Sequence, residues 1–230
     1  MKKLILYTIG FTSFLCCVNN KKEDSQKSWR EQKTVVEAIT IPSISKVKNG
    51  VKFINTGPRG GSYINSDSTE IRYTIFRVQI VNDTIIPLNL ELNFPETTIE
   101  LLPDSSILLN ISIIPDSLTP DNIQNNLNFG VIGIEEFFES ELSERYMLKT
   151  SIPPKEQHIV YIGIKFVSEL DNGTTRSILF INGQDIVAPF LPQKSIKINN
   201  KNPEILDLVY GIGVDPPNNY NLIPCGKIKY

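Results

Sequence analysis

The sequence contains little histidine, tryptophan or cysteine. His158 is the single histidine in 230 residues, and the three cysteines are Cys16, Cys17 and Cys225. A zinc site built from several imidazoles needs more than one histidine, and a serine nucleophile needs a base and usually a G-x-S-x-G turn, which is not present. We therefore interpret His158 as a residue at the start of a strand, and we predict no metal, no cofactor and no catalytic residue.

The sequence also lacks an apolar run long enough to cross a membrane as a helix. Lys2 and Lys3 are followed by a stretch from Leu4 to Leu15 that is apolar apart from small polar residues. This stretch would rise only about 18 Å as a helix, against roughly 30 Å of hydrocarbon. A short positive region followed by a short apolar region is typical of a signal peptide.

The apolar stretch ends in Phe14-Leu15-Cys16-Cys17 and turns polar at once. This resembles the signal of bacterial lipoproteins, in which one cysteine becomes the acylated first residue of the mature chain. Cys17 matches that pattern better, because the small Cys16 precedes it, whereas the bulky Leu15 precedes the alternative, Cys16. The resemblance implies a signal peptide at 1–16 and attachment to the outer membrane through acyl chains. A plain secretion signal is the other interpretation.

Residues 17–34 form a charged, core-poor stretch that we expect to be the acylated N-terminus and a flexible linker. Within it, Lys22, Glu23 and Asp24 resemble the surface-export signal of lipoproteins in the Bacteroidota. The chain as a whole is similar to flavobacterial-type surface lipoproteins of that phylum, which implies the cell surface. If the charges are only an arbitrary solvated linker, the domain faces the periplasm.

The chain has no excess of basic residues. It carries 23 lysines and arginines against 25 acidic residues, and without Lys2 and Lys3 the net charge is about −4. A mildly acidic chain without a basic stripe is a poor partner for nucleic acid. We therefore expect contact with the membrane to come from the acyl anchor.

Three runs alternate apolar and polar residues in the period of a half-buried strand. The clearest is PLNLELNF, in which Leu88, Leu90, Leu92 and Phe94 alternate with polar residues. The other two place Leu109, Ile111 and Ile113 on one face, and Val160, Ile162, Ile164 and Phe166 on one face. Each run predicts one buried and one wet face. Further strands are predicted at 51–54, 73–81, 98–102, 178–181, 185–188, 195–198 and 205–211.

Turn signals and one helical pattern complete the predicted fold. Asn182-Gly183 predicts a hairpin of type I′, and turns such as VNDTIIP recur at sandwich-like intervals. The segment 133–148 has helical spacing, and we expect this helix to plug or cross one end of the sandwich. We predict an all-β fold for 35–230, an immunoglobulin-like or related antiparallel β-sandwich with one short helix, with 199–230 as an extended C-terminal segment. Residues 72–95 resemble the opening strands of such domains.

The run NTGPRGGSY, residues 55–63, is the most distinctive predicted loop. Gly57, Gly60 and Gly61 permit positive φ and close backbone approach, and Arg59 can present a guanidinium to a carboxylate, phosphate or sugar. Together with Tyr63 these residues form a candidate ligand loop. The other interpretation is a flexible connection between two strands.

Two further sets of polar residues allow two interpretations each. Glu135, Glu136, Glu139 and Glu141 are either the solvated face of the helix or a carboxylate pair of a glycosidase. Three triplets that begin at Asp67, Asp83 and Asp116 resemble the O-glycosylation acceptor of the Bacteroidota, which implies Ser68, Thr84 and Ser117 as acceptors. Asp-Ser and Asp-Thr pairs are equally ordinary turn formers.

Cys225 has no partner within the mature chain. No histidine or cluster of lysines surrounds it in NLIPCGKIKY, so we expect an inert, partly buried thiol, with an intermolecular bond as the alternative.

These patterns favour a non-enzymatic binding or accessory module that captures a glycan or docks to an envelope protein. An aromatic patch near Tyr63, Tyr73 or Tyr220 would support it. The alternatives are a carbohydrate-active enzyme that uses clustered carboxylates, and a structural envelope protein.

Overall fold

The computed structural model describes the following residues of the chain: 43–44, 50–94, 98–101, 107–140, 143, 147–168, 173–183, 204–215 and 219–230. These residues all belong to the compact unit Thr40–Tyr230. Several predictions lie outside the described residues, namely those for the signal peptide, Cys16, Cys17, Lys22, Glu23, Asp24, Glu141 and the strands 185–188 and 195–198. In the described part no helix is long and apolar enough to span a bilayer.

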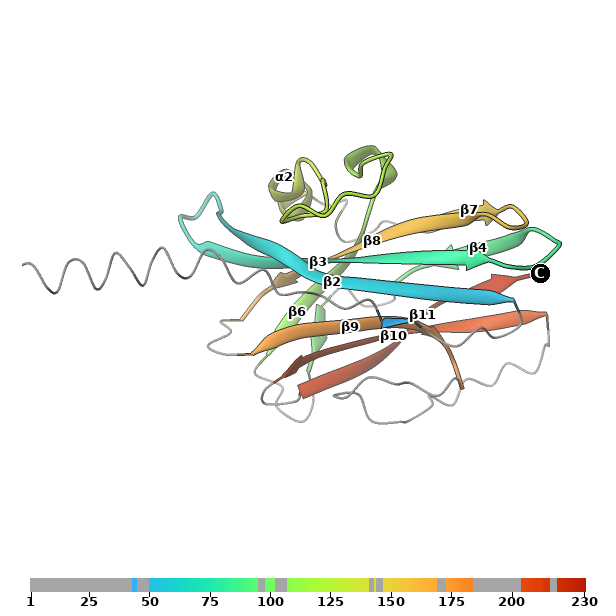
Figure 1. Cartoon of the computed structure of the whole chain (residues 1–230). Coiled ribbons are helices and arrows are strands. Elements are labelled where there is room, and N and C mark those ends of the chain that lie inside the picture. The colour runs from blue at the N-terminus through green and yellow to red at the C-terminus, as the bar shows by residue number, and fades with distance from the viewer. Residues whose placement is uncertain are drawn as a thin grey trace, which may run out of the picture. The chain divides into compact units, whose positions relative to one another are not determined.

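The described strands form two antiparallel sheets that pack face to face (Figure 1). Sheet A has the order β1 (Ser43–Ile44), β2 (Val51–Ile64), β3 (Glu70–Asn82), β8 (Gln157–Phe166), β6 (Leu108–Ile114) and β5 (Thr98–Glu100). Sheet B has the order β7 (Leu148–Ile152), β4 (Leu88–Leu92), β11 (Asn219–Lys229), β10 (Ile205–Asp215) and β9 (Thr174–Ile181). The predicted all-β sandwich is confirmed.

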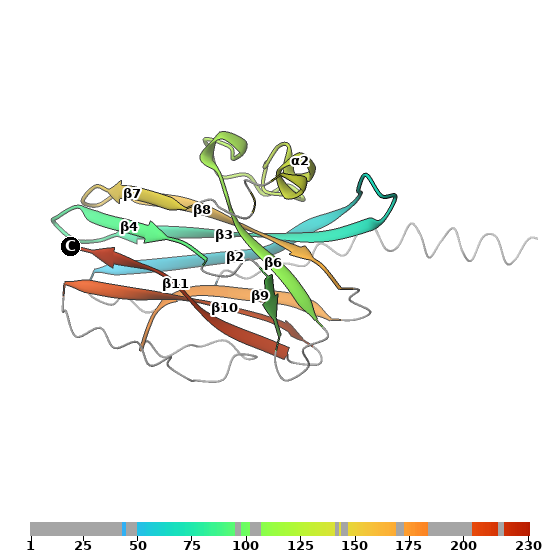
Figure 2. The ribbon, with the colours of Figure 1, turned by 180° about the vertical axis from the view of Figure 1, so that it is seen from behind.

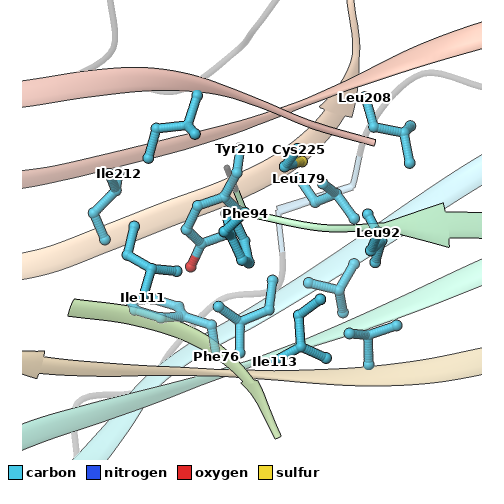
Figure 3. Close-up of a cluster of buried hydrophobic side chains, with 14 of the residues drawn as sticks. Phe76, Leu92, Phe94, Ile111, Ile113, Leu179, Leu208, Tyr210, Ile212 and Cys225 are labelled. Carbon is cyan, nitrogen blue, oxygen red and sulfur yellow. The ribbon is translucent and has the colours of Figure 1, made fainter. Parts of the chain in front are cut away.

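The core between the sheets uses the apolar faces that the alternation predicts. Leu88, Leu90 and Leu92 on β4 are each no more than 2% exposed. The predicted inward sets of β6 and β8 belong to the same core cluster. Figure 3 shows Phe94 beside Tyr210, whose ring centroids lie 5.4 Å apart, and Cys225 in the same layer. The Cys225 thiol is fully buried, whereas we predicted a partly buried one, and burial raises its pKa.

The other face of sheet A is not wet where we predicted it to be. Residues 115–147, the β6–β7 connection, contain the 3-10 helix η1 (Asp116–Leu118) and the helix α2 (Ile134–Glu139), and the part that includes α2 lies over the outer face of sheet A (Figure 2). Ile75, Ile114 and Tyr161 point outward from the sheet and form a second apolar cluster with Phe129, Val131, Ile134, Phe137 and Phe138 of the connection. The prediction that the helix plugs or crosses one end of the sandwich is therefore wrong, because α2 packs on a sheet face.

The helix is also shorter than the predicted 133–148. It ends at Glu139, where Ser140 adopts an extended conformation. Both the Ser140 N–H and the Ser140 hydroxyl donate to the carbonyl of Phe137, a local bond that competes with continuation of the helix. Leu148, at the end of the predicted helix, is the first residue of β7.

The predicted loop 55–63 is wrong as a loop, because these residues belong to β2. Their register with β3 is continuous apart from one bulge between Thr56 and Arg59. Gly57 adopts a φ of 142°, and a Cβ there would lie 2.6 Å from Phe76 Cδ1. Packing and backbone geometry therefore exclude any side chain at position 57, so glycine is required there although the residue lies within a strand.

Sheet B contains two strands that the alternation does not reveal, β7 and β11. β11 pairs with both β10 and β4, and β10 pairs with both β11 and β9, so β10 and β11 are interior strands of the sheet. The register of β10 with β11 shifts between Leu208 and Val209, opposite Gly226 and Pro224. A bulge moves the apolar residues out of period two, which hides the strand from a pattern search.

Asn55 joins the two sheets at their edge. Its side-chain nitrogen donates to the carbonyl of Leu179 at 3.2 Å, and its side-chain oxygen accepts from the Leu179 N–H at 2.8 Å. The side chain thus pairs with the backbone of β9 as another strand would, and Asn55 is only 5% exposed. These hydrogen bonds join β2 of sheet A to β9 of sheet B. The first residues of β9 line the candidate groove that is described below.

Candidate ligand groove

A groove of about 340 Å³ opens where the β2–β3 hairpin extends past β9. We call it the mouth groove. One side consists of hairpin residues, and the other side is formed by the end of β8 and the start of β9. The lining residues are Pro58, Arg59, Gly60, Gly61, Arg72, Tyr73, Thr74, Phe166, Gly173, Thr174 and Thr175. Three residues of the predicted ligand loop, Arg59, Gly60 and Gly61, are therefore part of one groove.

Gly60 allows the two strands of the hairpin to approach closely. A Cβ at this position would lie 2.2 Å from the carbonyl oxygen of Tyr73 and 2.8 Å from Thr74 Cα. Gly61 has room, because the nearest atom to its Cβ position is Tyr73 Oη at 3.7 Å. Close packing of the two backbones therefore requires glycine at position 60, whereas Gly61 leaves one part of the groove open.

The polar groups of the mouth groove are hydroxyls and a guanidinium. Thr74 Oγ1 is buried and has no hydrogen-bond partner in the described part of the chain. Gly60 lies opposite Thr74 in the register, so no side chain of β2 reaches across to this hydroxyl. Thr174 and Thr175 bring two more hydroxyls from β9, and Arg72 lines the same groove. Sequence reasoning missed Arg72 and Thr74, although Thr74 lies in the predicted strand 73–81 and Arg72 directly precedes it.

Arg59 directs its guanidinium toward the β6–β7 connection. Its Nη1 donates to the carbonyls of Asn125 at 2.7 Å and Asn126 at 3.1 Å, and its Cζ lies 5.3 Å from the centroid of Phe129. The groove is therefore lined by other parts of Arg59, while the charged group fastens the connection to the sheet.

Arg77 contacts the same phenyl ring from the neighbouring strand. Its Cζ lies 4.9 Å from the Phe129 centroid, and its Nη1 donates to the carbonyl of Gln124 at 2.8 Å. Burial lowers the pKa of Arg77, with a smaller effect of the Arg59 charge in the same direction and an opposing effect of Tyr161. Two cations held by carbonyls and one aromatic ring fix the tip of the connection.

Tyr63 lies outside the mouth groove, although we predicted it in the ligand loop. It is 6% exposed, and its hydroxyl donates to Glu139 Oε1 on α2. Burial, followed by this hydrogen bond and the charges of Glu139 and Glu135, raises the pKa of Tyr63. Tyr63 thus fastens α2 to β2.

The acidic residues of α2 that the structure describes, Glu135, Glu136 and Glu139, are exposed, as expected for a solvated face. Glu139 accepts from Tyr63 and lies 3.8 Å from Lys165 Nζ, and Lys165 also donates to the carbonyl of Phe138 at 2.8 Å. The Glu139 carboxylate therefore takes part in docking α2. None of the described residues that line the mouth groove is acidic.

The other residues singled out from sequence are distributed over the domain. His158 is half-buried on β8, and burial lowers its pKa against an opposing effect of Asp116. Within the described ranges no group of histidine, cysteine and acidic residues could hold a metal ion. Tyr73 and Tyr220 are half-buried, and the rings of Tyr73 and Tyr63 lie 6.2 Å apart.

The three candidate acceptor triplets lie in turns or in η1, but their hydroxyls differ. Ser68 and Ser117 are exposed. Thr84 Oγ1 lies 2.6 Å from Asn82 Oδ1 and 2.7 Å from the carbonyl of Ile86, so this hydroxyl already takes part in the β3–β4 turn.

The search for related proteins found no family model, no curated protein and no solved structure that matches this chain. The mouth groove and its lining residues thus remain the basis for a functional proposal.

Proposed function

We propose that the protein is a lipid-anchored, non-enzymatic binding module at the outer membrane or cell surface, and that its mouth groove binds a glycan. The anchor half of the proposal rests on the sequence around Cys17 and on the Lys22-Glu23-Asp24 run. The binding half rests on the groove, which combines hydroxyl groups from two sheets with the guanidinium of Arg72.

The observation that carries the binding half is the unpartnered hydroxyl of Thr74. Burial of a hydroxyl without a hydrogen bond costs free energy. Among the buried side-chain atoms of the described residues that lack a partner, Thr74 Oγ1 is the hydroxyl that belongs to a residue of the groove. A ligand hydroxyl in the groove would satisfy it. Thr174, Thr175 and Arg72 supply further donors and acceptors around the same space, which suits a sugar ring with several hydroxyls.

The experiment measures binding of the full chain in detergent to maltohexaose, xylohexaose, mannohexaose and chitohexaose by calorimetry and saturation-transfer NMR. We expect one of these to bind, and we expect Thr74→Val to abolish that binding because it keeps the shape and removes the hydroxyl. Thr56→Val is the matched control, since Thr56 lies on β2 outside the groove. No binding of any oligosaccharide, or equal binding by Thr74→Val, would contradict the proposal.

A further inference from the structure

A second groove, of about 350 Å³, lies on the three strands β4, β7 and β11 of sheet B. We call it the lysine groove. It is lined by Asn89, Leu90 and Glu91 of β4, by Lys149, Thr150 and Ser151 of β7, and by Lys227 and Lys229 of β11. The two grooves share none of the described residues that line them. The two grooves are therefore independent surfaces.

The strand register arranges the polar side chains in two rows across the groove. Glu91 lies opposite Lys149 on one side and Lys227 on the other. Asn89 lies opposite Ser151 and Lys229 in the same way. Neighbouring strands are about 4.8 Å apart and alternate residues about 7 Å apart, so the three ammonium groups spread over roughly 10 Å. The intervening residues Leu90 and Ile228 belong to the core between the sheets. Because side chains alternate along each strand, the two polar rows therefore lie on the outer face of sheet B.

The lysine groove is electropositive in a chain that is acidic overall. Lys149 Nζ lies 3.5 Å from Glu91 Oε1, and Lys227 Nζ lies 3.5 Å from Glu91 Oε2. No carboxylate side chain of the described residues forms an ion pair with Lys229. Among the described lining residues, three ammonium groups against one carboxylate give a local charge of +2. Desolvation acts to raise the pKa of Glu91, but the charges of both lysines outweigh it and lower that pKa, so Glu91 stays ionised.

We propose that the lysine groove binds an extended acidic polysaccharide, with its carboxylate or sulfate groups on the lysines and its hydroxyls on Asn89 and Ser151. The three ammonium groups come from the two strands that flank β4, with Lys149 on β7 and Lys227 and Lys229 on β11. This arrangement suits an extended chain better than a single small anion, which needs donors that converge on one point. Nucleic acid is disfavoured, because none of the described residues that line the groove is an aromatic residue on which a base could stack. The amide and hydroxyl row matches the hydroxyl groups of a sugar chain.

The experiment measures binding of the full chain in detergent to five probes. They are heparin, polygalacturonate, dextran, single-stranded RNA and mixed micelles that contain phosphatidylglycerol. We expect binding to heparin or polygalacturonate that weakens as sodium chloride rises from 50 to 500 mM, and no binding to dextran. The comparison of heparin with polygalacturonate distinguishes sulfate from carboxylate. Tighter binding to RNA or to the phosphatidylglycerol micelles than to both acidic polysaccharides would overturn the proposal.

Charge variants locate the site. We expect Lys227→Gln and Lys229→Gln each to weaken polysaccharide binding roughly two- to fivefold, the range of an exposed ion pair. Glu91→Gln should strengthen it by a similar factor, because it removes the competing carboxylate. Lys52→Gln on β2 of sheet A makes the same change in net charge and should have no effect. An equal loss in Lys52→Gln, or weaker binding in Glu91→Gln, would show that the groove is not the site.

Discussion

Thr74→Val separates stability from binding in the mouth groove. Valine has nearly the same shape as threonine and also favours strands, so the substitution changes little except the hydroxyl. Thr74 Oγ1 is buried without a partner in the described part of the chain. Removal of a buried, unsatisfied hydroxyl should therefore stabilise the folded state, whereas removal of a satisfied one would destabilise it.

The expected gain in the free energy of unfolding is about 1 kcal/mol. Burying a hydroxyl without compensation costs about 1–3 kcal/mol in proteins, and we take the lower end because the Thr74 residue as a whole is only half-buried. For a domain of this size the melting temperature should rise by roughly 2–4 °C. The same variant should lose oligosaccharide binding, which would be a trade of function against stability.

Urea denaturation followed by far-UV circular dichroism measures the change in stability, and calorimetry measures binding. Thr56→Val on the same hairpin, outside the groove, serves as the control for the threonine-to-valine exchange itself. A loss of 1 kcal/mol or more in Thr74→Val would mean that the hydroxyl has a partner in the folded protein. That result would refute the argument that the groove holds an unsatisfied group for a ligand.

Three further predictions concern the interior. Asn55→Ala should lower the free energy of unfolding by about 2–4 kcal/mol in urea titrations, because it leaves the N–H and the carbonyl of Leu179 unpaired; a loss below 0.5 kcal/mol would contradict the bridge. Gly163→Ala should lower the free energy of unfolding by about 1–3 kcal/mol and speed hydrogen exchange in α2, because its Cβ would lie 2.9 Å from Phe138 Cζ. Gly61→Ala is the control, because its Cβ has room and should change neither quantity. Unchanged exchange in Gly163→Ala would argue against docking of the helix on Gly163. The raised pKa of Cys225 predicts that the free energy of unfolding falls as pH rises above about 8.5, because the thiol ionises there in the unfolded chain and not in the folded one. Cys225→Ala should remove this pH dependence. If the variant retains it, another group causes it.

The sequence predicts the inward faces of this sandwich well, for a simple physical reason. On β4 and β8 the residues that alternate with polar ones face the core, because a slip of one residue would bury the polar set. The pattern fails on the outer side of β8. Tyr161 and Gly163 read as exposed residues in a two-residue period, but the β6–β7 connection covers them. Period two reports how residues alternate and carries no information about a distant segment that packs on the second face.

Bulges and close backbone contacts account for the other errors. Glycine usually indicates a turn or a strand end when a sequence is searched for strands. Gly57, Gly60 and Gly226 nevertheless lie within strands, where a Cβ would collide with the neighbouring strand. The candidate site was predicted in part. The glycine run marks the correct hairpin, but the hydroxyls of Thr174 and Thr175 reach the groove only through the pairing of β9 with β10 and its position beside β2. The Arg59 guanidinium binds the β6–β7 connection at Asn125, Asn126 and Phe129. These partners lie more than 60 residues away in the sequence, so they could not be predicted without the fold.

The most direct test of the proposed surface-anchored module is protease shaving of intact cells that express the tagged chain, together with detergent phase partitioning of Cys16→Ala and Cys17→Ala variants. The proposal predicts that external protease removes the protein, and that only Cys17→Ala leaves the detergent phase. Protection from protease would contradict the export role of Lys22, Glu23 and Asp24 and would place the domain in the periplasm. Retention of Cys17→Ala in the detergent phase would contradict the anchor on Cys17.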